Sequence, residues 1–451
     1  MKKKPNILWI MTDEQRKDSI GCYGSEWAAT PHIDRLAKEG VLFENAITPS
    51  PMCVPARLSV LTGKYPHETG VWNNKHSKDS EEHLTHCFEE AGYVTASFGK
   101  QHYQTKNNAF GTEVTFELGS EVEYTKYHER YEESDYDIVR YRGKSPWLLG
   151  GKFPADISET QENKVVELAK AFLSRHEDER PFLLRMSFNG PHTPVVPPEP
   201  FASSMEDRKI GIPAASEGPR GSIPEWTKAL IENYAGSHVM TDAEMEKARK
   251  YYYGYASYVD HEIGSMLDWM SDEGWLENTI VVFMSDHGTH LGDYGLVQKQ
   301  TFYEPSVSVP FIFWYPEQFK SGTRIATPVE TRWMLPALLD LVGIEATVQL
   351  SCNRLSESLR SGQEPAAVPV YSEFILNSLP LFEEDKILMV RTGPWKFTAR
   401  FGDSGELIER SLSHMEDDPY EHHNLAKEQE HQDKVASMTR VLQERLRLET
   451  R

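Results

Sequence analysis

The chain has few cysteines, no long apolar run and no excess of positive charge. Its 4 cysteines among 451 residues are scattered, with no C-x-x-C pair, which argues against a disulfide framework. No apolar run approaches the ~18 residues of a membrane-spanning helix, so no membrane partner is expected. The net charge of −21 argues against a nucleic-acid partner, which would need a basic surface. An anionic substrate must therefore be attracted by a local positive site.

A recognisable export signal is also lacking. The segment MKKKPNILWIMTDEQ is basic and then apolar, but its apolar part is shorter than the ~7–15 residues of a signal peptide's central region. We expect a buried first strand here and a cytoplasmic protein. Export is the alternative if a signal has been removed.

Apolar runs alternate with helical patterns along the chain, which predicts an α/β sheet. Ligands of such sheets bind beyond the carboxyl ends of the strands. Three of the four clearest runs end in polar residues, so these ends are expected to meet in one crevice. The four runs cover residues 6–11, 181–188, 279–286 and 309–315.

The length suits one large domain and a smaller one. Residues 386–401 predict a β-hairpin and residues 428–449 predict an amphipathic helix. We therefore predict a catalytic domain over residues 1–345 and a C-terminal α+β domain over residues 346–451. Two long insertions are expected at the mouth of the pocket. They cover residues 107–152, rich in Tyr and charge, and residues 196–242, rich in Pro, Gly and Ser.

Cys53 is followed by Pro55, Arg57 and a helix-forming run. Proline is favoured at the first helical position because it needs no N–H partner there. This places Cys53 at a helix N-terminus, where free amides and the macrodipole favour an anion, and Arg57 adds a permanent cation. The pattern predicts a site for a tetrahedral oxyanion such as sulfate or phosphate, with Cys53 as the reactive residue. Taken alone, it also fits a buried thiol beside a structural proline and a surface arginine.

Two pairs of metal-ligating residues follow buried strands. Asp13 and Glu14 end the first predicted strand, and Asp286 and His287 end the third. Each pair alone fits a turn or a helix N-cap. Both pairs would stand at the same sheet edge, however, which favours a metal site. Carboxylates suit Ca²⁺ or Mg²⁺, and an imidazole admits Mn²⁺ or Zn²⁺.

Four basic side chains surround these pairs in the predicted layout. Lys100 and His102 follow a further predicted strand and point to one face. His192 lies in a proline-rich loop, and Lys299 comes shortly after the second metal pair. Singly, each fits a surface or structural residue. Together they predict cations around an anion, able to bind ester oxygens and transfer protons.

These segments together resemble the type I sulfatases of the alkaline phosphatase superfamily, in the family's order and along the whole chain. The resemblance implies an alkaline-phosphatase-like α/β sandwich, in which helices flank a large central mixed sheet, followed by a small C-terminal domain with an antiparallel sheet and a helix. The matching motifs are C-x-P-x-R at Cys53–Arg57, G-K-x-H at Gly99–His102, P-H-x-P at Pro191–Pro194, S-D-H-G with L-G-x-x-G and K at Ser285–Lys299, and D-P-x-E-x-x-N-L at Asp418–Leu425.

The resemblance also implies chemistry that the letters do not show. A dedicated maturation enzyme, a partner of this chain, would oxidise Cys53 to formylglycine, whose hydrate is the nucleophile. The implied catalytic residues are Cys53, Arg57, Lys100, His102, His192 and Lys299, and the implied metal ligands are Asp13, Glu14, residue 53, Asp286 and His287. The expected ion is Ca²⁺, with Mn²⁺ or Mg²⁺ as alternatives.

Three positions depart from the commonest family pattern. Ala56 stands where serine is usual, Glu14 replaces an often-seen aspartate and His287 replaces an asparagine. The last two resemble the branch that holds choline sulfatases and phosphonate monoester hydrolases. Asn74 resembles a substrate-binding asparagine that lines the anion pocket in the choline-sulfatase branch, and a turn residue is the equal alternative.

The expected function is hydrolysis of a sulfate ester of a carbohydrate, or of a small aryl or alkyl alcohol, with release of sulfate. A phosphonate monoester or phosphodiester hydrolase is the alternative. Such enzymes tend to carry neutral hydroxyl residues at the positions of Lys100 and His102, so these two favour sulfate. A catalytically silent binding protein with an unconverted Cys53 is the remaining alternative, and assembly into a homo-oligomer stays open.

Overall fold

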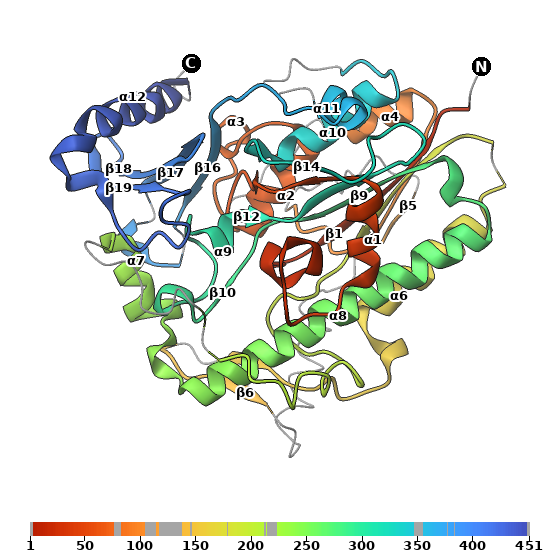
Figure 1. The fold of residues 1–451 in the computed structure, drawn as a ribbon, viewed down its shortest axis with the longest axis horizontal. Helices are drawn as coiled ribbons and strands as arrows, with labels where there is room; N and C mark the ends of the chain where they lie inside the picture. Colours follow the sequence, from red (N-terminus) through yellow and green to blue (C-terminus); the bar gives the residue numbers. More distant parts are fainter. Residues whose placement is uncertain are drawn as a thin grey trace.

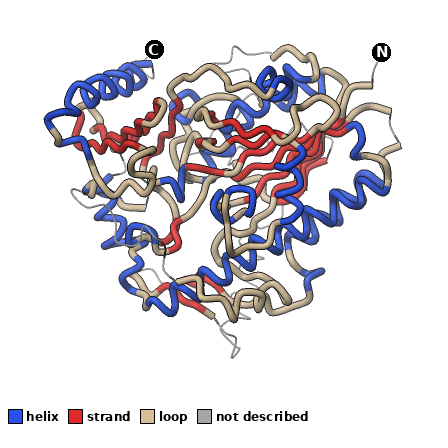
Figure 2. The backbone as a smooth tube through the Cα atoms, viewed as in Figure 1, coloured by secondary structure: helices blue, strands red, loops and turns tan. Residues whose placement is uncertain are grey.

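The computed structural model consists of a large sheet between two layers of helices, with a smaller sheet at one side (Figure 1). Figure 2 shows the strands gathered in this central layer and the longest helices packed along it. The structure describes residues 3–75, 83–103, 114–116, 138–144, 147–177, 179–211, 213, 223–346, 355–376, 378–382 and 384–448.

The large sheet has eight strands in the order β14-β2-β13-β9-β1-β8-β4-β5. β1 lies near its centre and pairs in parallel with β8 and β9, whereas β13 runs antiparallel to β9 and β2. The sheet is therefore mixed, as expected. Its strands are β1 (Asn6–Thr12), β2 (Val41–Phe43), β4 (Val94–Gly99), β5 (Val114–Phe116), β8 (Phe182–Ser187), β9 (Thr279–Ser285), β13 (Phe311–Trp314) and β14 (Thr323–Ile325).

Both faces of the large sheet are buried, because helices cover each one. Along β1, Ile7, Trp9 and Met11 belong to the core on one face, and Leu8 and Ile10 to the core on the other. The first core is completed by α2 (Cys53–Thr62), α4 (Thr85–Glu90), α10 (Met334–Leu341) and α11 (Leu355–Ser361). The second is completed by α1 (Pro31–Glu39), α6 (Gln161–Ser174) and α8 (Asp242–Asp272).

A four-stranded antiparallel sheet follows in the C-terminal part. Its strands are β16 (Val370–Ile375), β17 (Lys386–Thr392), β18 (Trp395–Phe401) and β19 (Leu407–His414). The helix α12 (Gln432–Leu448) packs on it (Figure 1). The hairpin predicted over residues 386–401 is thus confirmed as β17 and β18. The terminal helix begins at Gln432 rather than at residue 428, because residues 429–431 form a separate 3-10 turn.

The two sheets share a core instead of standing apart. Val370, Phe374, Ile387 and Met389 from the small sheet pack in the same apolar cluster as the large sheet's Ile7 and Trp9. The predicted boundary after residue 345 stays a prediction.

Most of the insertion predicted over residues 107–152 lies outside the described residues. The insertion over residues 196–242 contains the short helix α7 (Glu225–Leu230). No helix in the described part of the chain combines the length and apolar character needed to cross a membrane. A cytoplasmic location stays a prediction.

The remaining strands are short and form three small sheets of two or three strands, and two further α-helices are a single turn long. They are β3 (Ala46–Ile47), β6 (Val139–Tyr141), β7 (Trp147–Gly150), β10 (His290–Leu291), β11 (Val297–Gln298), β12 (Ser308–Val309), β15 (Val329–Glu330), α3 (Pro66–Thr69) and α9 (Glu304–Val307).

Candidate active site

The predicted site residues lie at one edge of the large sheet. In the parallel register, Thr12 of β1 stands beside Ser285 of β9, and Met11 stands beside Ser187 of β8. The residues that follow these strands therefore emerge side by side. This places Asp13 and Glu14, Asp286 and His287, and the loop that carries His192 at the same edge, as the sequence predicts.

Helix α2 brings Cys53 to this edge from one face of the sheet. The helix begins at Cys53. Pro55 therefore occupies its third position, whereas the sequence predicted the first. Proline is still tolerated there, because the N–H groups of the first turn have no partner within the helix. At its other end, α2 stops at Gly63, whose φ of 70° is the left-handed conformation that glycine adopts most easily.

Arg57 joins the two acidic strand ends. Its Nη2 lies 2.7 Å from Asp13 Oδ2 and its Nε lies 2.7 Å from Asp286 Oδ2, with all three side chains fully buried. Its Nη1 donates to the carbonyl of Lys100 and to Ser187 Oγ, each at 2.9 Å. The planar guanidinium therefore fixes both carboxylates relative to the Lys100 backbone.

The Cys53 thiol sits among positive groups. Its Sγ lies 3.1 Å from His287 Nε2 and 3.3 Å from Lys299 Nζ. Burial acts to raise the pKa of the thiol, but Lys299, His287 and Lys100 hold that pKa well below its usual value. A low thiol pKa marks an environment that stabilises an anion at this point.

Asp13 carries an unused acceptor in the middle of the site. Lys100 Nζ lies 2.6 Å from its Oδ2, whereas its Oδ1 is buried without a hydrogen-bond partner. Ligand atoms of Asp13, Cys53, Asp286 and His287 all lie within 4.8 Å of one another. Oxygen donors with an imidazole fit a divalent ion, and an ion would give the buried Asp13 oxygen the partner it lacks.

Glu14 belongs to a second group of possible metal ligands, beside the first one. Its ligand atoms group with those of Asp13 and His192, and its backbone has a φ of 59°. The Glu14 Oε1 lies 3.0 Å from Lys299 Nζ, and its Oε2 accepts from the backbone N–H of Thr193 at 3.2 Å. Glu14 therefore ties the His192 loop to Lys299, beside the four-residue cluster.

His192 and Lys299 form a pair that opens to the outside. Lys299 Nζ lies 2.9 Å from His192 Nε2, and the His192 side chain is 21% exposed. The loop before His192 is fixed by a hydrogen bond to α6, because the N–H of Gly190 donates to the buried Glu162 Oε1 at 2.9 Å. Of the groups described here, this pair is placed to meet the outer part of a bound ester.

His102 and Asn74 approach Cys53 from two further loops. His102 lies beside the thiol and helps to lower its pKa. The Asn74 Oδ1 accepts from the backbone N–H of Val54 at 3.0 Å. Asn74 thus satisfies one of the free amides at the start of α2. The two roles predicted for it, a substrate contact and a turn residue, do not include this hydrogen bond.

Sequence reasoning missed two buried residues of β8 that support the site. Ser187 Oγ accepts from Arg57, as described above, and from Arg185 Nη2 at 3.1 Å. The signal was present as a charge and a hydroxyl two residues apart in an otherwise apolar strand, since such residues share one face.

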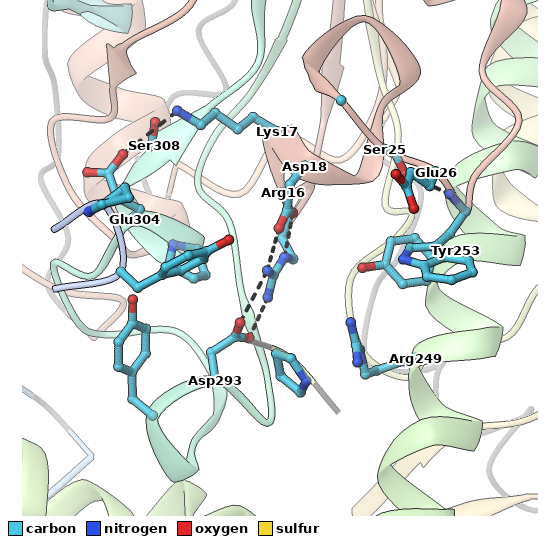
Figure 3. Close-up of a pocket in the computed structure, with 17 residues that line it drawn as sticks. Arg16, Lys17, Asp18, Ser25, Glu26, Arg249, Tyr253, Asp293, Glu304 and Ser308 are labelled. Atoms are coloured by element: carbon cyan, nitrogen blue, oxygen red, sulfur yellow. Dashed lines mark hydrogen bonds and ion pairs between the residues drawn. The ribbon is translucent and has the colours of Figure 1, made fainter. Parts of the chain in front are cut away.

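A separate cavity is lined by Arg16, Lys17 and Asp18, which follow Glu14 in the chain. Figure 3 shows Arg16 between Asp18 and Asp293, with Arg249 of α8 opposite. The cavity has a volume of about 300 Å³. Its wall is coupled to the site, since Tyr252 Oη accepts from Arg16 N and donates to the Glu14 carbonyl. These contacts explain how the strained backbone at Glu14 is held in place.

Comparison with known proteins identifies the family. The sequence model of the sulfatase family matches residues 5–344. The chain belongs to the sulfatase family. A second model, for the C-terminal part of N-sulphoglucosamine sulphohydrolase, matches residues 292–448. The chain is accordingly a sulfuric ester hydrolase, and the site at the sheet edge is the candidate active site of a sulfatase.

Curated relatives and solved structures agree with this assignment. The chain is 28% identical to an arylsulfatase of Clostridium perfringens, over 97% of this chain and 94% of the relative. It is 33% identical to an ulvan-active sulfatase of Formosa agariphila, over 79% of this chain and 65% of the relative.

The sulfatase fold is shared with solved structures. A protein solved with its substrate D-glucosamine-2-N,6-O-disulfate matches with a TM-score of 0.83 at 21% identity, covering 99% of this chain and 98% of that one. The phosphonate monoester hydrolase of Agrobacterium radiobacter matches with a TM-score of 0.82 at 22% identity, covering 99% of this chain and 96% of that one.

Proposed function

We propose that this sulfatase hydrolyses a sulfate ester of a carbohydrate, with formylglycine at position 53 as the source of the nucleophile. The observation that carries the proposal is the position of the Cys53 side chain, 3.1 Å from His287 and 3.3 Å from Lys299 at the head of α2. The sulfated-sugar substrate class is supported by the names of the ulvan-active relative and of the disulfate complex. A small aryl or alkyl sulfate is the next candidate.

A divalent ion fits the donor set at this position. We propose that Asp13, Glu14, Asp286 and His287 hold it together with residue 53, and that the ion is Ca²⁺, with Mn²⁺ or Mg²⁺ as alternatives. When bound, such an ion supplies Lewis-acid polarisation of a sulfate oxygen and lowers the pKa of the nucleophilic hydroxyl. The unpartnered Asp13 Oδ1 supports this assignment.

The basic residues bind the sulfate group and neutralise its charge. Arg57 is locked between Asp13 and Asp286, so it acts from a fixed position. Lys100 and Lys299 each contact one of the acidic strand-end residues and can turn an N–H toward the ester oxygens. Fixed donors of this kind stabilise the charge that develops as the S–O bond breaks.

Two histidines are placed to move protons. One hydroxyl of the hydrated aldehyde at residue 53 attacks sulfur, and the S–O bond to the alcohol breaks as His192, paired with Lys299 and partly exposed, donates a proton to the alcohol oxygen. His102, which lies beside residue 53, then removes the proton from the second hydroxyl, so that the C–O bond to the sulfate group breaks, sulfate leaves and the aldehyde returns.

Replacement of the reactive residue tests the proposal. Cys53→Ala should lower kcat for sulfate esters by at least about a thousandfold, with circular dichroism and Tm close to wild type. Cys87→Ala is the matched control, because Cys87 is also a buried cysteine outside any disulfide but lies in α4; it should keep full turnover. Near-wild-type activity of Cys53→Ala would refute the scheme.

Mass and substrate measurements separate the alternatives. The peptide with residue 53, from a host that has the maturation enzyme, should be lighter than its cysteine form by the exchange of sulfur for oxygen and the loss of two hydrogens. An unmodified peptide would favour a silent binding protein. In a matched assay, nitrophenyl sulfate and sulfated sugars should be hydrolysed faster than phenyl phosphonate esters; the opposite order would favour the phosphonate hydrolase.

A further inference from the structure

Arg185 is a buried cation in the middle of the large sheet. It lies in β8, where its neighbours are apolar, and its side chain is fully buried. Burying a guanidinium is costly unless the structure uses its hydrogen bonds and charge. Arginine also keeps its charge in proteins. The position of this residue therefore requires an explanation beyond packing.

Arg185 and Arg57 share the same two acceptors. Arg185 Nη2 donates to the carbonyl of Lys100 and to Ser187 Oγ, each at 3.1 Å. Arg57 Nη1 donates to the same two oxygens at 2.9 Å. The carbonyl of Lys100 is thus held from two sides, and the backbone that carries Lys100 is fixed relative to the arginine that joins the acidic strand ends.

Arg185 also holds the far side of the same turn. Its guanidinium lies between two aromatic rings, 4.8 Å from the centroid of Trp9 and 5.0 Å from that of Tyr103, a favourable arrangement for a desolvated cation. Tyr103 in turn donates to Gln101 Oε1 at 3.1 Å. The turn from Lys100 to Tyr103 therefore wraps around the Arg185 side chain, with His102 at its bend in a left-handed conformation of φ 52°.

We propose that Arg185 is a positioning residue that fixes Lys100 and His102 against the sulfate group and adds a second buried positive charge behind it. The inference rests on the proposed function, because Lys100 and His102 act there as sulfate ligand and proton acceptor. Without Arg185, one hydrogen bond to the Lys100 carbonyl and one stacking partner of Tyr103 are lost. Small displacements of catalytic groups lower rates strongly.

Two substitutions separate position from charge. Arg185→Met keeps the length and removes the hydrogen bonds and the charge, whereas Arg185→Lys keeps the charge but cannot form the flat, shared contacts. We expect Arg185→Met to lower kcat by about tenfold to a hundredfold, with Arg185→Lys intermediate. Loss of the charge should raise the inhibition constant for the sulfate dianion more than it raises KM for the monoanionic ester. In Arg185→Lys, which keeps the charge, the ratio of the inhibition constant to KM should return to the wild-type value.

Arg249→Met is the matched control for the loss of a buried arginine. Arg249 is also buried, lies near the ring of Tyr253 and donates to the carbonyl of Gly211, at the cavity of Figure 3. We expect its Tm to fall as much as that of Arg185→Met, with kcat, KM and inhibition by sulfate unchanged. Tm and circular dichroism of all variants are measured first, followed by kinetics and by calorimetric titration with inorganic sulfate.

The outcomes are distinct. Wild-type kcat and sulfate affinity in a folded Arg185→Met would overturn the inference, and so would wild-type values in Arg185→Lys if the Met variant does not fold. If the wild type hydrolyses no sulfate ester, the proposed function fails by itself. The calorimetric titration then still decides whether Arg185 fixes the anion site, because sulfate binding needs no turnover.

Discussion

At the scale of single residues, Asn74 links the loop after α3 to the head of α2. Its side-chain oxygen accepts the Val54 N–H at 3.0 Å, while Met52, which precedes the helix, gives no side-chain cap. A free amide at a helix start is a cost that a polar side chain removes. This contact makes Asn74 a remote cap of the helix that presents residue 53.

Asn74→Ala should lower the free energy of unfolding by ~1 kcal/mol, the usual cost of a lost cap. Asn74→Asp should keep most of the stability, because it retains the acceptor at a helix N-terminus. Urea unfolding measures both. A KM that rises more than tenfold in Asn74→Ala at unchanged stability would instead show a direct contact with substrate.

The sequence predicts the residues of the site better than the residues that support them. Asp13 and Asp286 could be recognised because each directly follows an apolar strand, and parallel strand ends share an edge. Arg185 and Ser187 lie within such a strand, where their spacing of two residues is a weaker signal than a polar pair at a strand end. Asn74 could not be placed either, since its partner is a backbone amide and leaves no pattern in the sequence.

At the scale of elements, α12 is anchored to the short helix α3 through one carboxylate. Glu373 of β16 lies 2.9 Å from Arg445 Nε of α12 and 2.7 Å from His67 Nδ1 of α3. The ring of Tyr65 lies close to the guanidiniums of both Arg445 and Arg332. Burial raises the pKa of Glu373, but Arg445 and His67 outweigh it and lower that pKa from 4.5 to about 2.

This lowered pKa gives a prediction with a defined sign. Because the folded pKa lies below the unfolded one, the charged Glu373 stabilises the protein above about pH 4.5, and this contribution is lost as the pH falls toward 2. Glu373→Gln should therefore cost ~3 kcal/mol at pH 7 and progressively less toward pH 3. Chemical unfolding at several pH values measures it.

Glu430→Gln is the control for that series, because the side chain of Glu430 is 76% exposed. It should follow the wild type at every pH. A constant difference in the free energy of unfolding between Glu373→Gln and the wild type from pH 7 to pH 3 would contradict the assignment.

The sequence predicts α12 and the hairpin from their periodicity, but it holds no signal for this anchor, which joins residues more than seventy positions apart.

At the scale of the whole molecule, a divalent ion that joins the acidic strand ends should stabilise the folded state. Asp13, Glu14 and Asp286 are all buried, and the basic side chains around them leave Asp13 Oδ1 without a hydrogen bond, so an ion that binds there adds to stability. Removal of divalent ions by a chelator should therefore lower Tm. Return of Ca²⁺ at about 100 times its Kd should add ~2.7 kcal/mol, measured by differential scanning fluorimetry over a series of ions.

Asp286→Asn tests whether the ion acts at this site. The variant should lose most of the shift in Tm that Ca²⁺ gives the wild type. A larger shift in Tm with Mn²⁺ than with Ca²⁺ would assign Mn²⁺ as the ion, at the same position. Equal Tm values for the wild type with and without every ion would contradict the proposed metal site.

The burial of Cys53 sets an order of events during synthesis. In the finished protein this residue is 1% exposed, and its contact Lys299 comes 246 residues later in the chain. An enzyme that oxidises Cys53 must therefore reach it before the pocket closes. At a translation rate of ~5–20 residues per second, the ribosome leaves an interval of roughly 10–50 s between the two residues, and the proposed maturation would have to compete with folding within it.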